Sequence, residues 1–155
     1  MKEINVSELK DNMFDAISKE WMLVTAGTQE KFNMMTASWG GTGVLWAKPV
    51  AFIFIRPERY TYQFIEEGET LTLSFLGEDH KDIHKICGSK SGRDIDKVAA
   101  TGLKPFATPE GNIAYEQARM VLECRKLYAD MIKPEQFIDC LLYTSPSPRD
   151  RSLSR

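Results

Sequence analysis

The sequence feature that most constrains the fold is a pair of short apolar segments separated by only a few residues. These segments are Trp21–Gly27 (WMLVTAG) and Lys31–Trp39 (KFNMMTASW), and Thr28, Gln29 and Glu30 lie between them. Two β-rich runs joined by so short a connection are typical of a β-hairpin. We therefore predict that residues 21–39 form two paired antiparallel strands.

Three further segments have the pattern of strands. Residues 49–56 (PVAFIFIR) are almost continuously apolar, and residues 70–76 (TLTLSFL) alternate leucine or phenylalanine with threonine or serine. Residues 118–128 also alternate, with Met120, Leu122 and Cys124 on one face, which predicts a half-exposed strand. We expect the glycines at positions 40, 41 and 43 to end the hairpin.

Short helices are predicted around these strands. Ser7 is a candidate N-cap for an amphipathic helix, whose apolar residues are Leu9, Met13, Phe14 and Ile17. Residues 61–67 and 79–87 also fit helices, and a glycine follows each of them. Several strands joined by short turns, with helices inserted between some of them, favour a mainly β fold, a closed antiparallel barrel rather than a doubly wound sheet.

Composition predicts one globular domain without nucleic-acid or membrane partners. The chain has 155 residues, of which 43% are hydrophobic and 27% charged, which is enough for a single core. Lys and Arg number 20 against 22 Asp and Glu, so the net charge is −2 and a polyanionic partner is not expected. The apolar run Val50–Ile55 is too short to span a bilayer, and no signal-peptide core begins the chain. We expect a cytoplasmic location.

The last residues differ in composition from the rest of the chain. Residues 141–155 (LLYTSPSPRDRSLSR) are rich in Ser, Pro and Arg and have lost the apolar periodicity. Such composition is typical of disorder. We interpret residues 1–140 as the folded domain and residues 141–155 as a non-native disordered tail.

Three segments carry groups that suit a ligand, and each has an ordinary alternative. Residues 33–41 (NMMTASWGG) offer an amide, hydroxyls, an indole and glycines that let a planar ligand approach, or they form a turn with a core tryptophan. Residues 56–61 (RPERYT) place two arginines before a helix N-terminus, where phosphate is favoured, or they hold a solvated arginine pair. Residues 89–97 (SKSGRDIDK) are a cationic hydroxyl-rich loop, or an ordinary exposed loop.

Taken together, the three segments resemble a known family. The patterns NxMTASWGG, RPxRYT and SGRDxDK occur in this order, with linking text such as WMLVTAG, KPVAFIFIRP, LSFLG and LECR. From about Trp21 to Cys140 the chain resembles the flavin reductase-like FMN-binding family, which includes the flavoredoxins. This resemblance implies an antiparallel split β-barrel of Greek-key type with short inserted helices. It also implies a homodimer with one FMN per subunit near the dimer interface.

The resemblance implies which residues hold the cofactor. Those that would line the isoalloxazine ring and the ribityl chain are Asn33, Thr36, Ala37, Ser38 and Trp39. Those that would lie near the phosphate or close the pocket are Arg56, Arg59, Thr61, Ser91 and Lys97. Arg59 and Lys97 are the best candidates for the phosphate. Because family members continue past IKPEQFID with residues that complete the barrel edge, residues 1–140 are interpreted as a C-terminally incomplete FMN-binding domain.

The implied chemistry belongs to the cofactor. Flavin N5 accepts hydride from a reduced nicotinamide and passes electrons on, so no catalytic side chain is expected. The main hypothesis is an FMN-dependent oxidoreductase, an NAD(P)H:flavin or ferric-type reductase with a small-molecule or protein acceptor. The alternatives are a flavoredoxin-type electron carrier that a protein partner reduces, and a cofactor-free binding module.

Other polar residues have ordinary explanations. His80 and His84 are four apart on an expected helix, but Lys81 stands where a zinc protease carries Glu, so we expect a solvated face and no metal site. Three cysteines without a C-x-x-C pair predict reduced thiols, and the helix dipole should raise the pKa of Cys87. Trp21 and the Met34-Met35 pair are expected in the core.

Overall fold

The computed structural model describes residues 1–139, which fall into two units. The first unit, Met1–Arg125, contains every strand described below and all ten candidate site residues. The second begins at Lys126, and its described part contains the 3-10 helix Pro134–Gln136. Cys140 and the predicted tail over residues 141–155 lie outside the described residues. Within residues 1–139, no helix has the length and apolar character needed to cross a bilayer.

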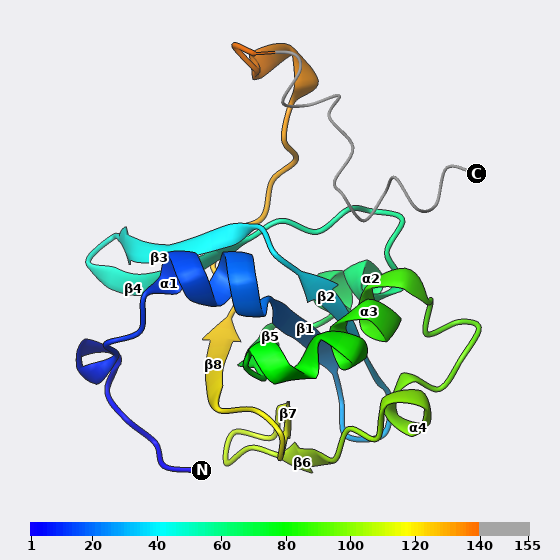
Figure 1. The fold of residues 1–155 in the computed structure, drawn as a ribbon. Helices are drawn as coiled ribbons and strands as arrows, with labels where there is room; N and C mark the ends of the chain where they lie inside the picture. Colours follow the sequence, from blue (N-terminus) through cyan, green and yellow to red (C-terminus); the bar gives the residue numbers. More distant parts are fainter. Residues whose placement is uncertain (140–155) are drawn as a thin grey trace. The chain divides into compact units, whose positions relative to one another are not determined.

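The main sheet has four antiparallel strands in the order β2-β1-β5-β8 (Figure 1). Their bounds are β1 Met22–Gly27, β2 Phe32–Ala37, β5 Thr70–Phe75 and β8 Met120–Arg125. The register of β1 and β2 begins with Gly27 opposite Phe32 and ends with Met22 opposite Ala37. The hairpin predicted over residues 21–39 is therefore confirmed, as are the alternating strands.

Both faces of this sheet are covered by other elements. On one face, Val24 and Leu73 pack with Phe64 of α2 (Tyr60–Glu67). On the other face, Leu23 and Met34 pack with Cys87 of α3 (Lys81–Ser89). Because successive side chains of a strand point to opposite faces, β2 lies between α2 and α3 and sends side chains to both.

Two smaller hairpins complete the strands of the first unit. The strands β3 (Gly40–Leu45) and β4 (Lys48–Ile53) pair with each other, as do β6 (Pro105–Ala107) and β7 (Ile113–Tyr115). The hairpin predicted to end at glycines 40, 41 and 43 ends at Ala37, and these glycines form part of the next strand, β3. A Cβ on Gly40 would stand 2.3 Å from the Phe52 carbonyl oxygen, so the bare backbone is what permits this close pairing. The turn places Trp46 and Ala47 at positive φ, as a type I′ hairpin requires.

The helices that the sequence predicts lie in the expected places, but their first and last residues differ from the prediction. The predicted cap Ser7 is wrong: Asn5 caps a 3-10 helix over Val6–Glu8, and Asn12 caps α1 (Met13–Asp15), which a π-helical stretch over Ala16–Glu20 follows. Each asparagine side chain accepts hydrogen bonds from free backbone N–H groups of the first turn, and for this reason asparagine is favoured at the N-cap. The helix α3 follows a 3-10 turn at Glu78–His80 and runs past Gly88 to Ser89. A further short helix, α4, spans Lys97–Thr101.

The architecture is mainly antiparallel β with short inserted helices, as predicted. The β3–β4 hairpin packs Ala51 and Ile53 against the same core face as Phe64. Residues 49–56 were predicted as one apolar strand, but β4 ends at Ile53, and Phe52 and Phe54 remain exposed. The hairpin thus covers the main sheet with one side and presents apolar side chains on the other.

Candidate functional site

The first group of candidate residues ties β2 to α2. Asn33 is buried, and its side-chain amide donates a hydrogen bond of 2.8 Å to Oγ1 of Thr61, which is also buried. The loop after α3 closes over this pair at Gly92, where a Cβ would stand 2.1 Å from Asn33 Oδ1. A glycine is therefore needed for the loop to lie so near the amide. Each of the three sequence motifs contributes one residue to this contact: Asn33 from the first, Thr61 from the second and Gly92 from the third.

Ser91 begins the loop that closes over Asn33. Its backbone carbonyl accepts hydrogen bonds from the amides of Asp94 and Ile95, and its hydroxyl accepts one from the amide of Arg93. The Arg93 guanidinium lies over the Tyr60 ring, 4.6 Å from its centroid. The loop is thereby held in a tight turn against the start of α2.

The second group binds backbone carbonyl groups of α3, from the middle of the helix to its carboxyl-terminal end. Thr36 Oγ1 donates to the His84 carbonyl oxygen at 2.7 Å. Arg59 Nη2 donates to the Gly88 carbonyl oxygen at 3.0 Å. Lys97 Nζ donates to the Cys87 carbonyl oxygen at 3.0 Å and to that of Met34 at 2.7 Å. Three candidate residues that are far apart in sequence are thus brought together by one helix.

The charges at this helix end affect one another. Burial lowers the pKa of Lys97 from 10.5 to about 8, and the positive charge of Arg59 lowers it further, while Cys87 acts in the opposite direction. Burial raises the pKa of the Cys87 thiol from 9.0 to about 11, against the effect of Lys97. The rise expected for Cys87 is confirmed, with burial as its first cause. Arg59 and Lys97 are close enough to repel each other.

The third group lies at the end of β2. Trp39 is 48% exposed, and the guanidinium carbon of Arg56 lies 5.7 Å from the centroid of its ring. Arg56 therefore stands with Trp39 and not at the helix end, although its carbonyl oxygen accepts the Arg59 amide at 3.0 Å. Beside them, a Cβ on Gly41 would meet nothing within 4 Å, so the backbone there is open.

Burial divides the ten candidates into two classes. The side chains buried inside the first unit are Asn33, Thr36, Ala37, Thr61 and Lys97. Those that are half-buried or exposed are Ser38, Trp39, Arg56, Arg59 and Ser91. A ligand arriving from solvent meets the second class directly. The buried side chains hold in place the strand and the helices beside which the more exposed candidates lie.

Sequence reasoning missed one residue of this arrangement. His84 was expected on a solvated face, but it is 1% exposed, and its ring lies edge-on to Trp21 with the centroids 5.9 Å apart. His80 is half-buried, so the expectation of a solvated face is wrong for both histidines. The signal was the i, i+3 spacing of His84 and Cys87, which places them on one buried face of α3. Residues 1–139 hold no group of three or more His, Cys, Asp and Glu side chains suited to a metal ion.

The core predictions fare better. Met34 and Met35 are both buried, as expected, and Trp21 is half-buried. Cys87 and Cys124 are free thiols. The chemistry of the site is therefore to be sought in the cations, the amide and hydroxyl groups and the exposed indole.

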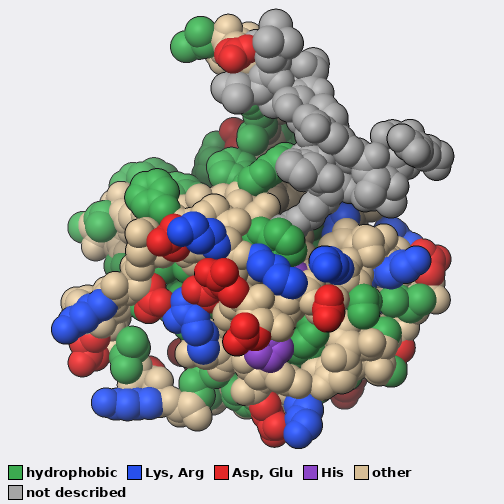
Figure 2. Space-filling view, viewed as in Figure 1, with side chains coloured by type: hydrophobic (Ala, Val, Ile, Leu, Met, Phe, Trp, Pro, Cys, Tyr) green, Lys and Arg blue, Asp and Glu red, His purple; other side chains and the backbone are tan. Residues whose placement is uncertain are grey.

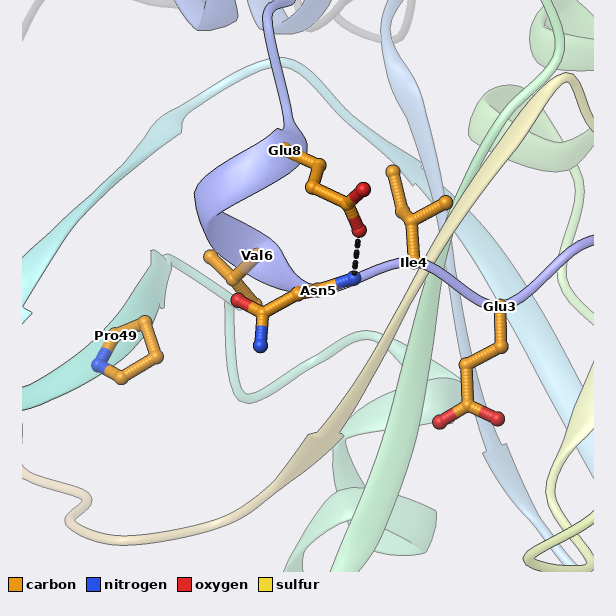
Figure 3. A pocket seen from close by; sticks show the side chains of 6 residues that line it. All are labelled: Glu3, Ile4, Asn5, Val6, Glu8 and Pro49. Carbon is orange, nitrogen blue, oxygen red and sulfur yellow. Dashed lines mark hydrogen bonds between the residues drawn. The ribbon is translucent and has the colours of Figure 1, made fainter.

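One surface hollow lies away from all of these residues. It has a volume of about 590 Å³, and its walls come from the N-terminal segment and β4 (Figure 3). The side chains that line it are Glu3, Ile4, Asn5, Val6, Glu8 and Pro49. Glu8 Oε2 accepts a hydrogen bond of 2.8 Å from the backbone N–H of Asn5, so this carboxylate caps a 3-10 turn. None of the ten candidates contributes to the hollow.

Comparison with solved structures shows the fold. A flavoredoxin of Desulfovibrio vulgaris (Miyazaki F) superposes with a TM-score of 0.66 at 22% identity, covering 84% of this chain and 69% of that one. An FMN-binding protein from Thermus thermophilus, solved with bound 1-cyclohex-2-enone, gives 0.66 at 23%, covering 85% and 72%. An NADH:FAD oxidoreductase of Streptomyces globisporus, in complex with NAD and FAD fragments, gives 0.58 at 20%, covering 73% and 66%.

These likenesses confirm the flavin reductase-like, FMN-binding split-barrel fold. A comparison with curated proteins gives no match. The sequence profile described as "Flavin reductase like domain" matches residues 14–131, which include every candidate site residue. The chain belongs to the flavin reductase like domain family.

Proposed function

We propose that this chain is an FMN-dependent oxidoreductase of the flavin reductase type. It would pass electrons from NAD(P)H through bound FMN to a flavin, a ferric compound or a protein acceptor. Membership of the family supports a flavin-related redox function. The observation that carries the proposal is the pair of cations, half-buried Arg59 and buried Lys97, placed where β2, α2 and α3 meet.

The positive field of these two neighbouring cations favours the phosphate of FMN, and Arg59, the more exposed of the two, is the group that would contact it. The repulsion between Arg59 and Lys97 contributes to the low pKa of Lys97, and a bound anion would relieve it. A guanidinium presents a planar set of donors that matches phosphate oxygens. Arg59 is also the N-cap residue of α2, where the helix dipole favours a negative charge.

The end of β2 fits the flat ring of the cofactor. The exposed Trp39 indole offers an aromatic face, and the open backbone at Gly41 allows close approach. Arg56, which belongs to the second motif, would also lie against the flavin ring, because its guanidinium is already placed over the Trp39 indole. When bound, FMN supplies the hydride chemistry, and these residues orient it and exclude water.

A flavoredoxin-type electron carrier is the second candidate. The same cations and the same aromatic end would serve it, and the likeness to the Desulfovibrio flavoredoxin favours it. It differs in its electron source, which would be a redox protein. A cofactor-free binding module ranks last, because Arg56, Arg59 and Lys97 are all present.

The test uses the full chain and begins with FMN titration followed by flavin fluorescence and visible absorbance. We expect saturable binding, and Arg59→Met should weaken it by about 10- to 150-fold, the loss of one charge-assisted hydrogen bond. Lys104→Met is the matched control, because it removes an exposed cation outside the site. The Lys104 ammonium lies 3.6 Å from a carboxylate oxygen of Glu116.

Anaerobic stopped-flow mixing then separates the two flavoprotein roles. Bleaching of the bound flavin by NADH or NADPH supports the reductase, and reduction by a redox protein alone supports the carrier. Absence of FMN binding by the wild-type chain would leave only the binding module.

The proposed partner in assembly is a second copy of this chain. The β3–β4 hairpin, its turn and the segment directly after it expose large apolar side chains (Figure 2). They are Val44, Leu45, Trp46, Phe52 and Phe54. Several exposed large apolar side chains gathered on one hairpin are typical of a protein interface, and the hairpin adjoins Trp39 in the chain. We therefore propose a homodimer whose interface lies beside the flavin ring.

A further inference from the structure

We propose that Lys97 is a positioning residue and not a phosphate ligand. Its ammonium fixes the carboxyl-terminal end of α3 against β2, and this fixed end sets the place of the Arg59 guanidinium. The inference rests on the proposed FMN site, which it deepens by dividing the roles of the two cations.

The first step concerns the free carbonyl groups of α3. The last carbonyl groups of a helix have no partner within the helix, and those of Cys87 and Gly88 belong to the final turn. Lys97 donates a hydrogen bond to the Cys87 carbonyl oxygen, and Arg59 donates one to the Gly88 carbonyl oxygen. Both cations therefore act as side-chain caps at the helix end where the dipole favours positive charge.

The second step concerns the other bond of Lys97. The same ammonium donates to the Met34 carbonyl oxygen of β2, so one nitrogen joins the strand to the helix. The residue is only 4% exposed. An ammonium has three N–H donors, and two of them go to these buried carbonyl oxygens. Lys97 is thus committed to the backbone and faces the protein interior.

The third step concerns Arg59, which contrasts with Lys97 in exposure. Arg59 is half-buried and reaches the Gly88 carbonyl oxygen from the start of α2. That oxygen is next in the chain to the one that Lys97 holds. If Lys97 is removed, the bond from Thr36 to the His84 carbonyl oxygen still holds the middle of α3, but the last turn loses the link that Lys97 makes to β2, and the anchor of Arg59 moves with it. Arg59 then meets the phosphate in the wrong place.

The test compares FMN with riboflavin, which lacks the phosphate. Affinities for both are measured in four proteins: wild type, Lys97→Met, Arg59→Met and the double variant. We expect K97M to lower the ratio of FMN affinity to riboflavin affinity by about tenfold when Arg59 is present, since one misplaced charge-assisted bond is lost. In the R59M background, K97M should leave this ratio unchanged.

Two results would overturn the proposal. A fall of the ratio in both backgrounds would make Lys97 a phosphate ligand in its own right. An unchanged ratio in both would make it a structural residue without influence on the phosphate end. K104M, which removes an exposed lysine elsewhere, serves as the control for a change in net charge.

A second readout needs no flavin. The Lys90 amide donates to the Ile86 carbonyl oxygen at 3.0 Å and so reports the last turn of α3. We expect its hydrogen exchange to speed up by about tenfold or more in cofactor-free K97M, and unchanged exchange would overturn the tie to β2. Lys97→Gln, which keeps a donor, replaces K97M in all arms if K97M does not fold. If the wild-type chain binds neither flavin, the proposed function fails, and the exchange result alone decides the role of Lys97 at α3.

Discussion

Asn33 and Thr61 form a buried hydrogen bond of 2.8 Å that joins β2, which carries the start of the first sequence motif, to α2, which begins within the second. The bond links β2 to the first turn of α2, directly after the Arg59 cap. Gly92 of the third motif closes over it. The three motifs are therefore interlocked inside the protein, behind the side chains that a ligand can reach.

The fit of Gly92 against Asn33 predicts a marked effect of Gly92→Ala. A Cβ at this position would stand 2.1 Å from Asn33 Oδ1 and 3.1 Å from Tyr60 Cδ1, so the loop or the amide must shift. We expect the free energy of unfolding to fall by about 1–3 kcal/mol, as in other overpacked sites. Urea unfolding measures it. Gly41→Ala is the matched control, with a change within about 0.5 kcal/mol, because a Cβ there meets nothing within 4 Å.

The hydroxyl of Thr61 is predicted to matter more than its methyl group. Thr61→Val keeps the shape but leaves the Asn33 amide with a buried donor that has lost its acceptor. We expect a loss of about 1–3 kcal/mol in the free energy of unfolding. Thr61→Ser, which keeps the hydroxyl, should retain most of the stability. Equal losses in both variants would assign the effect to packing of the methyl group.

The sequence predicts those parts of the fold that local periodicity controls. The hairpin over residues 21–39, the alternating strand β5 and the helix α2 follow from patterns within a few residues of each other. The strand β3 does not, because glycines disfavour strands and its partner β4 decides its conformation. Pairing between segments overrides local preference there.

The candidate site shows the same division. The motifs supply the right residue types, but burial, which decides what each one can do, depends on packing. The period of a strand does indicate that Asn33 and Thr36 point to opposite faces of β2, toward α2 and α3 respectively. Nothing in the sequence indicates that Lys97 turns inward to the Cys87 and Met34 carbonyl oxygens.

Lys97 gives the stability of the chain a pH dependence of defined sign. Its pKa is about 8 in the folded protein, below its ordinary value of 10.5. Between these pH values the unfolded chain keeps a proton that the folded chain has lost, so the free energy of unfolding rises with pH. Below about pH 8 both states are charged and the cost of burying the ammonium is fully present.

The measurement is the difference in the free energy of unfolding between wild type and K97M, followed from about pH 7 to about pH 10.5. We expect the difference to rise by up to about 3 kcal/mol over this window, since one pKa unit corresponds to about 1.4 kcal/mol. Because Lys97 lowers the pKa of Cys87, the contribution of Cys87 above about pH 9 differs between the two proteins, so the sign of the change is taken between about pH 8 and pH 9. A flat or falling difference would contradict a buried, charged Lys97.

Cys87 is predicted to be unreactive in the folded protein. The residue is fully buried, and burial raises the pKa of its thiol to about 11, so little thiolate forms near neutral pH. We expect iodoacetamide at about pH 8 to modify Cys87 at least about 100-fold more slowly in the native chain than in urea. Peptide mass spectrometry distinguishes it from Cys124 and Cys140. Rapid native labelling would instead indicate an accessible thiol at the end of α3.

The exposed apolar residues of the β3–β4 hairpin predict how the dimer can be broken. Val44 is 76% exposed in the single chain, so Val44→Lys should leave the stability of the monomer unchanged. In a symmetric dimer the substitution places a charge on both sides of the interface, and we expect the dimer dissociation constant to rise by at least about tenfold. Sedimentation velocity over a range of concentrations measures this. Ala107→Lys, at an exposed position of β6, adds the same charge away from the hairpin and should leave the dimer intact. A wild-type chain that remains monomeric would contradict the proposed dimer. A V44K chain that dimerises as well as the wild type would place the interface elsewhere, because a lysine buried in an apolar interface would weaken it.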